Sequence, residues 1–380
     1  MEFIVQNPFK FDIEVNGIFF CGREKDINDV SDYIYNQTNL IMFSKRRIGK
    51  SSLIKEIFSN KLDKNILTTH IDIYAISNIR ELYEHLKVGI EHSLTGKETS
   101  LDKLAKLSEE LRGYFTNTNI NLIISANPKL ELNSTEKDYY KALEYLFYGY
   151  FIFLKKRNLQ AVIAIDEFQK IMSLNKSDKI EALLRTIVNK RENCSFIFTG
   201  SKRNLLLSLF NRSDRPFFKL GYEYQLDAID FEEFYDWTNS RFKRKNIIID
   251  KDAFRYLYDE ADGETRFIQL ISYQIFRKQD NDSIVTLNAI IDYIEETIRR
   301  KQDLGALLDT YTTAQQNTLK IIAICDGINI FEDRVVSEYD IKVSSIQSAL
   351  KSLIEKGIVF KTDKKIQFED VEFKLWLKRI

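Results

Sequence analysis

The stretch from Ser44 to Ser51 reads Ser-Lys-Arg-Arg-Ile-Gly-Lys-Ser and places three cations beside a glycine, a lysine and a hydroxyl. An apolar run ends just before it, and an amphipathic segment follows at once. This is the layout of a phosphate-binding loop between a buried strand and a helix, whose N-terminal backbone N–H groups point at phosphate oxygens. In such a loop Lys50 reaches the outer phosphates, and the hydroxyl of Ser51 ligates Mg²⁺.

The loop departs from the usual pattern at one position. The glycine that normally opens it, five residues before Gly49, is replaced by Ser44. A serine fits such a turn where its φ is negative. Because a Gly-Lys-Ser tripeptide also occurs in ordinary surface turns, the interpretation depends on a second motif.

The second motif is Ala161–Glu167, in which five apolar residues precede two carboxylates. Such a run is typical of a strand buried on both faces of a parallel sheet, and ligands collect at the C-terminal ends of these strands. We expect Asp166 to hold the Mg²⁺ shell and Glu167 to orient and activate the attacking water. The alternative is a core strand that ends in an exposed acidic turn. The loop at 44–51 favours the functional interpretation.

The elements that must position these side chains alternate between strand and helix. Strands are expected at 40–43, 66–74, 161–165 and 195–199, and helices at 26–35, 51–60 and 180–190. This alternation predicts an α/β fold with a doubly wound parallel sheet whose loops gather at one edge. Residues 75–160 are expected to form a mostly helical insertion with a hairpin at 120–132. We interpret the insertion either as a partner-contact element or as a mere enlargement of the domain.

With 380 residues the chain is long enough for more than one domain. We expect a P-loop core over residues 1–226, a helical lid over 227–304 and a winged-helix domain over 305–380. In the lid, apolar residues recur at three- and four-residue spacing between 231 and 299, and Gly263 separates two of the helices.

The last domain has the pattern of a helix-turn-helix followed by a wing. Helices are expected at 314–325 and 344–356, with Ser344 as the N-cap of the second helix and Gly357 just past its end. Alternating stretches on both sides of a turn predict a two-stranded wing over 358–368.

A winged helix of this kind binds either DNA or protein. If it binds DNA, the second helix presents polar side chains to the groove, and lysines of the wing meet phosphates. The groove residues are Ser345, Gln347, Ser348 and Lys351, and the phosphate contacts are Lys361, Lys364 and Lys365. Acidic residues dilute this basic face, and winged helices also serve as protein-contact modules, so both kinds of partner stay open.

Composition limits the other function classes. The chain has 56 basic and 56 acidic residues, so no global field points to a nucleic-acid or membrane partner. Its three cysteines are widely separated, as in a reducing cytosol, and its three histidines show no metal-ligand spacing with them. No apolar run approaches the about 20 residues of a membrane span, and the first residues lack a signal-peptide pattern. We therefore expect a cytoplasmic protein without a membrane partner.

Four motifs together resemble those of the archaeal-type ATPases, in the AAA+/STAND branch of P-loop NTPases. They are Phe20–Glu24, Arg46–Ser52, Ile165–Glu167 and Thr199–Ser201. The resemblance extends over nearly the whole chain, including the helical lid and the winged-helix tail. It implies that ATP or ADP binds between the α/β domain and the lid, with the Gly-Arg-Glu stretch of the first motif near the adenine.

The resemblance also implies which residues contact the nucleotide. They are Gly22, Arg23, Arg47, Ile48, Gly49, Lys50, Ser51, Ser52 and Arg266. A polar sensor is expected at the end of the fourth strand, here Ser201, and an arginine finger at Arg215, with Arg212 as the rival. Thr265 replaces the proline expected at the start of a lid helix, and Arg266 beside it is expected to reach a phosphate. The alternative for each of these arginines is an ordinary surface ion pair.

These features predict a Mg²⁺-dependent, ATP-hydrolysing switch. Lys50 supplies charge stabilisation and Glu167 holds the attacking water, as phosphoryl transfer requires, while Ser51 and Asp166 hold Mg²⁺. Lid closure would report the nucleotide state to the winged helix. The alternatives are an ADP-bound scaffold with little turnover, favoured by the departures at Ser44 and Thr265, and a DNA-binding regulator in which the P-loop fold is structural. A P-loop kinase is disfavoured because the paired carboxylates activate water. Whether the ATPase acts as a single chain or in a ring stays open.

Overall fold

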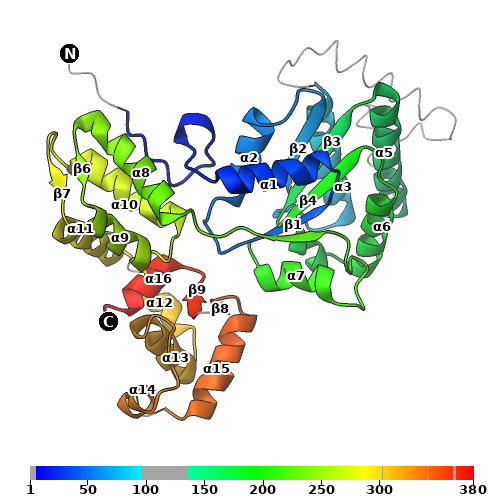
Figure 1. Cartoon of the computed structure of the whole chain (residues 1–380). Coiled ribbons are helices and arrows are strands. Elements are labelled where there is room, and N and C mark those ends of the chain that lie inside the picture. Colours follow the sequence, from blue (N-terminus) through cyan, green and yellow to red (C-terminus); the bar gives the residue numbers. More distant parts are fainter. Residues whose placement is uncertain (1–5, 96–135, 302, 340, 363–364) are drawn as a thin grey trace. The chain divides into compact units, whose positions relative to one another are not determined.

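The computed structural model describes residues 6–95, 136–301, 303–339, 341–362 and 365–380. By their contacts these residues fall into two compact units (Figure 1). The first, which we call the sheet unit, consists of Glu24–Ser44 and Lys50–Leu226. The second, the lid–wing unit, consists of the chain up to Arg23, Lys45–Gly49 and Asp227–Ile380. The hairpin expected at 120–132 lies outside the described residues.

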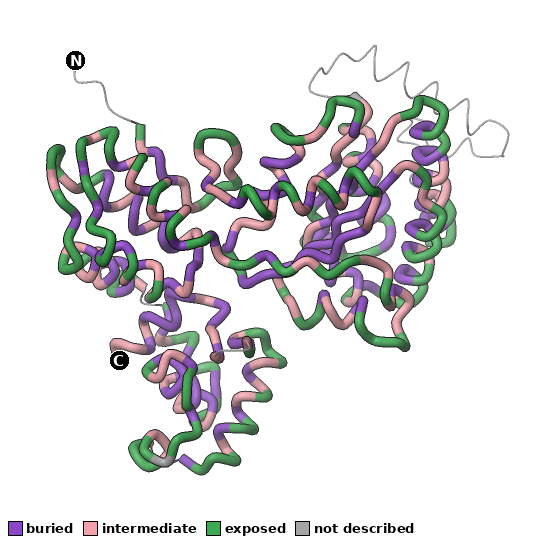
Figure 2. Tube along the Cα trace, viewed as in Figure 1, coloured by how far each residue is buried: buried purple, intermediate pink, exposed green. Residues whose placement is uncertain are grey.

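Within the part of the chain that the structure describes, the sheet unit has five parallel strands in the order β2-β3-β4-β1-β5 (Figure 1). They are β1 (Leu40–Phe43), β2 (Ile66–Asp72), β3 (Gln160–Asp166), β4 (Cys194–Thr199) and β5 (Tyr222–Gln225). All residues of β1 and β4 are buried, which Figure 2 shows as purple tube. Burial of whole strands means that both faces of the sheet are covered. The predicted doubly wound parallel sheet is therefore confirmed.

The fifth strand was not predicted. β5 pairs with β1 at one edge of the sheet, and its residues are mostly exposed. Its sequence, Tyr-Glu-Tyr-Gln, lacks both the apolar run and the clean alternation that mark a strand. Backbone pairing with β1, rather than burial of its side chains, places it in the sheet.

The helices of the sheet unit agree with the predicted alternation. They are α1 (Glu24–Tyr35), α2 (Lys50–Asn60), α3 (Ile79–Thr95), α5 (Glu136–Arg157), α6 (Ser177–Asn189) and α7 (Arg203–Asn211). The core between helices and sheet is rich in phenylalanine. Phe168, in the short 3₁₀ helix η3 (Phe168–Ser173), is fully buried, and its ring centroid lies 4.4 Å from that of Phe198. This contact anchors the chain directly after the acidic end of β3.

The lid–wing unit begins with a helical bundle. Its helices are α8 (Phe231–Phe242), α9 (Lys251–Glu260), α10 (Thr265–Lys278) and α11 (Leu287–Arg299). Gly263 separates α9 from α10, as predicted. The expectation of helices alone was wrong in one detail, because β6 (Ile248–Ile249) and β7 (Ile284–Val285) form a short parallel pair. In the described residues, no helix is both long and apolar enough to cross a membrane.

The predicted winged helix is confirmed. Its elements are α12 (Asp303–Asp309), α13 (Thr313–Ile324), α14 (Asp333–Glu338), α15 (Val343–Glu355), β8 (Val359–Lys361), β9 (Ile366–Phe368) and α16 (Val371–Leu377). β8 and β9 pair antiparallel as the wing. Gly357 follows the end of α15 as expected, but Ser344 is not its N-cap, because the helix starts one residue earlier, at Val343. The cap position belongs to Lys342, whose side chain makes no capping hydrogen bond.

The last helix, α16, was not predicted, and it joins two cores. Val371 and Leu375 pack into the apolar core of the lid helices. Phe373 and Leu377 pack into the core of the winged helix. Residues two apart lie on different faces of a helix, so the two pairs point to opposite sides of α16. The helix thereby joins the winged helix to the lid.

Candidate functional site

Asp166, the last residue of β3, accepts three hydrogen bonds within the sheet unit. Ser51 Oγ, in the first turn of α2, donates to its Oδ2 at 2.9 Å, and the backbone N–H of Glu167 donates to Oδ1 at 2.9 Å. The hydroxyl of Thr199, at the end of β4, also donates to Oδ1. Burial disfavours the charged carboxylate, but these hydrogen bonds and the ammonium of Lys50 outweigh it, so the pKa of Asp166 lies below its ordinary value.

Sheet order explains why these side chains meet. β4 lies between β1 and β3, with Met42 opposite Thr199 and Phe198 opposite Ile165. Because the strands are parallel, the segments that follow all three leave from the same edge of the sheet. The segments after β3 and β4 carry Glu167 and Ser201, and the segment after β1 leads into α2, whose first turn carries Lys50 and Ser51.

Lys50 and Ser44 are also brought together. Lys50 Nζ donates to Ser44 Oγ at 3.0 Å. Ser44 is buried and does not have a positive φ, so it meets the condition under which a serine replaces the opening glycine. Gly49 is different, because its φ of +106° lies in a region that side-chain-bearing residues rarely adopt. The serine therefore fits the turn and holds the lysine ammonium.

Glu167 is held by two polar side chains. Ser201 Oγ donates to Glu167 Oε2 at 2.9 Å, and Gln169 Nε2 donates to the same oxygen. Glu167 adopts φ +56° and ψ 35°, a left-handed conformation that is uncommon for a residue with a side chain. Gly200 makes room for Gln169, because a Cβ at residue 200 would lie 1.9 Å from Gln169 Oε1. The predicted sensor and the predicted water-holding carboxylate thus lie side by side.

Three residues of this group were not predicted as site residues. They are Thr199, Gln169 and His70, whose Nε2 lies 3.9 Å from Asp166 Oδ2. Thr199 had a usable signal, because a hydroxyl residue at the end of a buried strand lies at the ligand-binding edge of the sheet. Gln169 and His70 had none, since a single glutamine after a strand or a histidine within one is common in ordinary cores.

Arg23 is buried, and it supports the loop from within the lid–wing unit. Its Nη2 donates to the carbonyl of Ile48 at 2.9 Å, and its Nη1 donates to the carbonyl of Asp227 at 2.9 Å. Gly22 before it adopts φ +59°. The planar guanidinium suits two acceptors at once.

The start of α10 bonds to the same loop. Thr265 Oγ1 donates to the carbonyl of Ile48 at 3.0 Å, and the backbone N–H of Arg266 donates to the carbonyl of Arg47 at 3.2 Å. A proline at position 265 would lack this hydroxyl. The side chain of Arg266 is also engaged, because its Nη1 lies 3.6 Å from Glu372 Oε2.

Glu264, which precedes α10, is fully buried. Within the described residues, neither of its carboxylate oxygens has a hydrogen-bond partner. Burial raises the pKa of Glu264 to about 7, although the nearby cations Lys45, Arg47 and Arg266 favour the charged form and Asp370 opposes it. A carboxyl group in this position is about half protonated near pH 7.

The remaining predicted residues are more dispersed. Ser52 lies in the first turn of α2. Arg215 Nη1 donates to Glu181 Oε1 at 2.9 Å, and Arg212 Nη2 lies 2.6 Å from Asp214 Oδ2, so both candidate fingers are in ion pairs in this structure.

In the winged helix, the expected groove residues Gln347, Ser348 and Lys351 are exposed on α15, and Ser345 is partly exposed. Of the wing lysines, Lys361 is exposed, Lys365 is bonded to Asp262 of the lid, and Lys364 lies outside the described residues.

Comparison with known proteins bears on the family. Residues 20–271 match the model of an ATPase domain found predominantly in Archaea, and residues 304–379 match that of a probable winged helix domain. An uncharacterized ATP-binding protein of Methanocaldococcus jannaschii is 24% identical over 386 residues, which cover 94% of this chain and 98% of that protein. A second such protein from this organism is 33% identical over 173 residues, which cover 42% of this chain and 45% of that protein.

Solved structures share the fold. The Walker-type ATPase of Pyrococcus abyssi aligns over 98% of this chain and 100% of its own, with a TM-score of 0.65 and 16% identity. The ORC2 protein of Aeropyrum pernix aligns over 97% of this chain and 96% of its own, with a TM-score of 0.55 and 13% identity. At these identities the likeness concerns the fold alone. The family match covers well over half of the chain, so the resemblance seen in its motifs is confirmed, and the chain belongs to the family of ATPase domains found predominantly in Archaea.

Proposed function

We propose that this protein binds ATP with Mg²⁺, hydrolyses it, and uses the nucleotide state as a switch coupled to its winged helix. The observation that carries the proposal is the hydrogen bond from Ser51 to Asp166 beside Lys50, at the carboxyl edge of a parallel sheet. Two facts about similar proteins support it. The relatives from Methanocaldococcus jannaschii are named ATP-binding, and the ORC2 structure is of complexes with ADPNP and ADP.

The metal half of the site fits Mg²⁺. The Ser51 hydroxyl and the Asp166 carboxylate are oxygen donors, which Mg²⁺ prefers, and the ion usually takes its other ligands from water and substrate phosphates. Among the described residues, no group of three or more histidine, cysteine, aspartate or glutamate side chains is placed to hold a metal. A site of two protein ligands completed by ATP and water is therefore the arrangement that these residues support. When bound, Mg²⁺ would neutralise charge on the phosphates.

The protein's own groups would divide the remaining work. We propose that the Lys50 ammonium, now on Ser44, moves to the outer phosphates. Glu167 would orient the attacking water and accept its proton, while Ser201 and Gln169 hold its carboxylate in place. The other nucleotide contacts that we propose come from the loop and its surroundings: Gly22, Arg23, Arg47, Ile48, Gly49, Ser52 and Arg266.

Nucleotide binding is tested by replacing Lys50 with alanine. Removing a charge-assisted contact of about 1.5–3 kcal/mol should weaken ATP binding roughly 10- to 100-fold. Titration calorimetry with ATP and Mg²⁺ measures the change. The matched control is Lys61→Ala, which removes an exposed lysine just past α2 and should leave the affinity unchanged. Equal ATP affinity in the Lys50 variant and the wild type would refute the assignment of the phosphate loop.

Hydrolysis is tested by Glu167→Gln. The variant should keep its ATP affinity and lose most turnover, because a neutral amide cannot accept a proton from water. The control Glu223→Gln removes an exposed carboxylate on β5 and should retain wild-type turnover. If the wild type binds ATP but shows no turnover with Mg²⁺, with or without duplex DNA, the protein is a nucleotide-bound scaffold instead.

A further inference from the structure

An acidic segment just after the wing lies against the loop at 45–49, inside the lid–wing unit. The backbone N–H of Arg46 donates to Glu369 Oε2 at 3.3 Å. Arg47 Nη1 lies 3.5 Å from Asp370 Oδ2 and 3.7 Å from Glu372 Oε2. Three carboxylates therefore face the backbone N–H of Arg46 and the guanidinium of Arg47 in one short loop. We call residues 369–372 the acidic segment.

The acidic segment is enclosed by further cations. Glu372, whose side chain is only 6% exposed, lies 3.2 Å from Lys301 Nζ and 3.6 Å from Arg266 Nη1. Buried carboxylates are costly unless cations and hydrogen bonds compensate them. Asp370 also caps α16, because its Oδ1 accepts from the backbone N–H of Phe373 at 3.1 Å. These contacts make the segment an ordered part of this unit.

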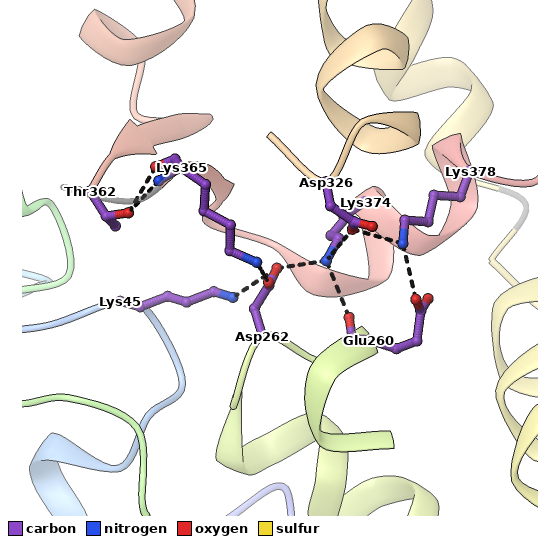
Figure 3. Close-up of polar contacts among 8 residues, drawn as sticks. All are labelled: Lys45, Glu260, Asp262, Asp326, Thr362, Lys365, Lys374 and Lys378. Carbon is purple, nitrogen blue, oxygen red and sulfur yellow. Dashed lines mark hydrogen bonds and ion pairs between the residues drawn. The ribbon is translucent and has the colours of Figure 1, made fainter. Parts of the chain in front are cut away.

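A second group of ion pairs supports the same arrangement (Figure 3). Asp262, between α9 and α10, has a side chain that is 1% exposed, and three lysines converge on it. Lys45 comes from the loop, Lys365 from the wing and Lys374 from α16, with Lys374 Nζ at 2.8 Å and Lys45 Nζ at 3.9 Å. The loop, the wing and α16 are thus joined through one carboxylate of the lid.

The loop's contacts with the acidic segment are those that a phosphate would need. A phosphate-binding loop works through backbone N–H groups and cationic side chains. Here the N–H of Arg46 and the guanidinium of Arg47 already face carboxylates. A carboxylate and a phosphate are both anions, so the two cannot occupy the same donors together.

We propose that the acidic segment is an internal inhibitor that occupies the loop at 45–49, and that the phosphates of a nucleoside triphosphate displace it. The proposal rests on the proposed function and deepens it. Glu369 follows β9 directly, so its displacement from the loop acts on the wing strand. Val371 and Leu375 keep α16 in the lid core, so the change is confined to the acidic turn and the wing. Because the two anions exclude each other, nucleotide binding weakens the docking of the acidic segment on the loop. Docking of the segment weakens nucleotide binding by the same factor.

The double variant Glu369→Gln with Asp370→Asn tests the competition. Both changes keep the shape of the side chain, and asparagine still caps a helix. Losing two carboxylates that compete for the loop should tighten the binding of ATP with Mg²⁺ roughly tenfold in titration calorimetry. The control Glu355→Gln with Asp309→Asn removes two exposed carboxylates elsewhere in the winged helix and should leave the affinity unchanged.

Equal or weaker ATP affinity in the Glu369/Asp370 variant than in the wild type overturns the competition while leaving the proposed function intact. Absence of ATP binding in both proteins removes the proposed function and this inference with it. A second measurement avoids mutation. Hydrogen exchange of the full-length wild type should become faster at the amides of residues 366–373 when ATP and Mg²⁺ are added. Unchanged or slower exchange there would also overturn the proposal.

Discussion

Replacing Gly200 with alanine should remove one of the two side-chain hydrogen bonds to the carboxylate of Glu167, the one donated by Gln169. No positive φ occurs at Gly200, so alanine fits the backbone there, but its Cβ would lie 1.9 Å from Gln169 Oε1 and 2.9 Å from Gln169 Cδ. Those atoms belong to the end of a flexible side chain. We therefore expect Gln169 to turn away, and its hydrogen bond to Glu167 to break.

The magnitude follows from the contacts. Overpacking of this kind costs about 1–3 kcal/mol of unfolding free energy. A hydrogen bond to a charged group contributes about 1.5–3 kcal/mol, and if a similar share is lost from the transition state, ATP turnover should fall tenfold or more. Ser201 would still hold Glu167, so some turnover should remain.

The assays are urea unfolding and ATP turnover, in the wild-type and Gln169→Ala backgrounds. Once Gln169 is an alanine, nothing is left to clash, so the second substitution should cost little in either assay. Gly305→Ala is the matched control, because among the described residues a Cβ there would meet only Trp376 Cζ2, at 3.8 Å. The reasoning is refuted if Gly200→Ala costs the same stability and turnover in both backgrounds.

Three further substitutions test other contacts. Thr199→Val removes the hydroxyl that donates to Asp166 and should lower the unfolding free energy at pH 7 by about 1–3 kcal/mol. Since the pKa of Asp166 is depressed in the folded protein, this difference should shrink as the pH falls below the ordinary pKa of an aspartate. A difference in urea unfolding that stays constant with pH would contradict this reasoning. Arg23→Lys cannot serve two carbonyls with one planar fork and should cost about 1–3 kcal/mol, which an unchanged urea midpoint would disprove. For Glu264 the pKa of the folded state is raised from 4.5 to about 7, so its contribution to stability is full below pH 4.5 and lost as the pH rises through 7. The unfolding free energy of Glu264→Gln should therefore rise relative to that of the wild type by up to about 3 kcal/mol between pH 4.5 and 8. If the unfolding free energies of the two proteins change with pH in parallel, Glu264 is not a buried carboxyl with a raised pKa.

Local pattern was enough for most of the fold. The apolar run at 40–43, the cation-rich loop after it and the acidic end of the strand at 161–165 are each written in a few consecutive residues. Alternation of strands and helices then limits the topology, because parallel strands require crossover helices and leave their loops at one edge. The same logic placed Ser51 near Asp166, and the structure joins them by a hydrogen bond.

Short or exposed elements escaped this reasoning. β5 is an edge strand of exposed residues, held by backbone pairing with β1, which leaves no mark in side-chain periodicity. Ser344 looked like a cap, but α15 starts one residue before it. The approach of Gln169 to Gly200 depends on two segments that follow different strands, so neither residue carries a signal alone.

By itself, the sequence determined that the chain has a cation-rich loop between a strand and a helix, a parallel sheet with an acidic edge, a helical bundle and a winged helix, because each depends on local periodicity and turn chemistry. Only the tertiary structure decided what the loop meets. Arg46 and Glu369 are separated by 323 positions in the chain. Their contact exists because Val371 and Leu375 pack α16 into the lid core, which brings the acidic segment beside the loop. The carboxylates of the segment are then partly buried, and the nearest cations compensate their charge.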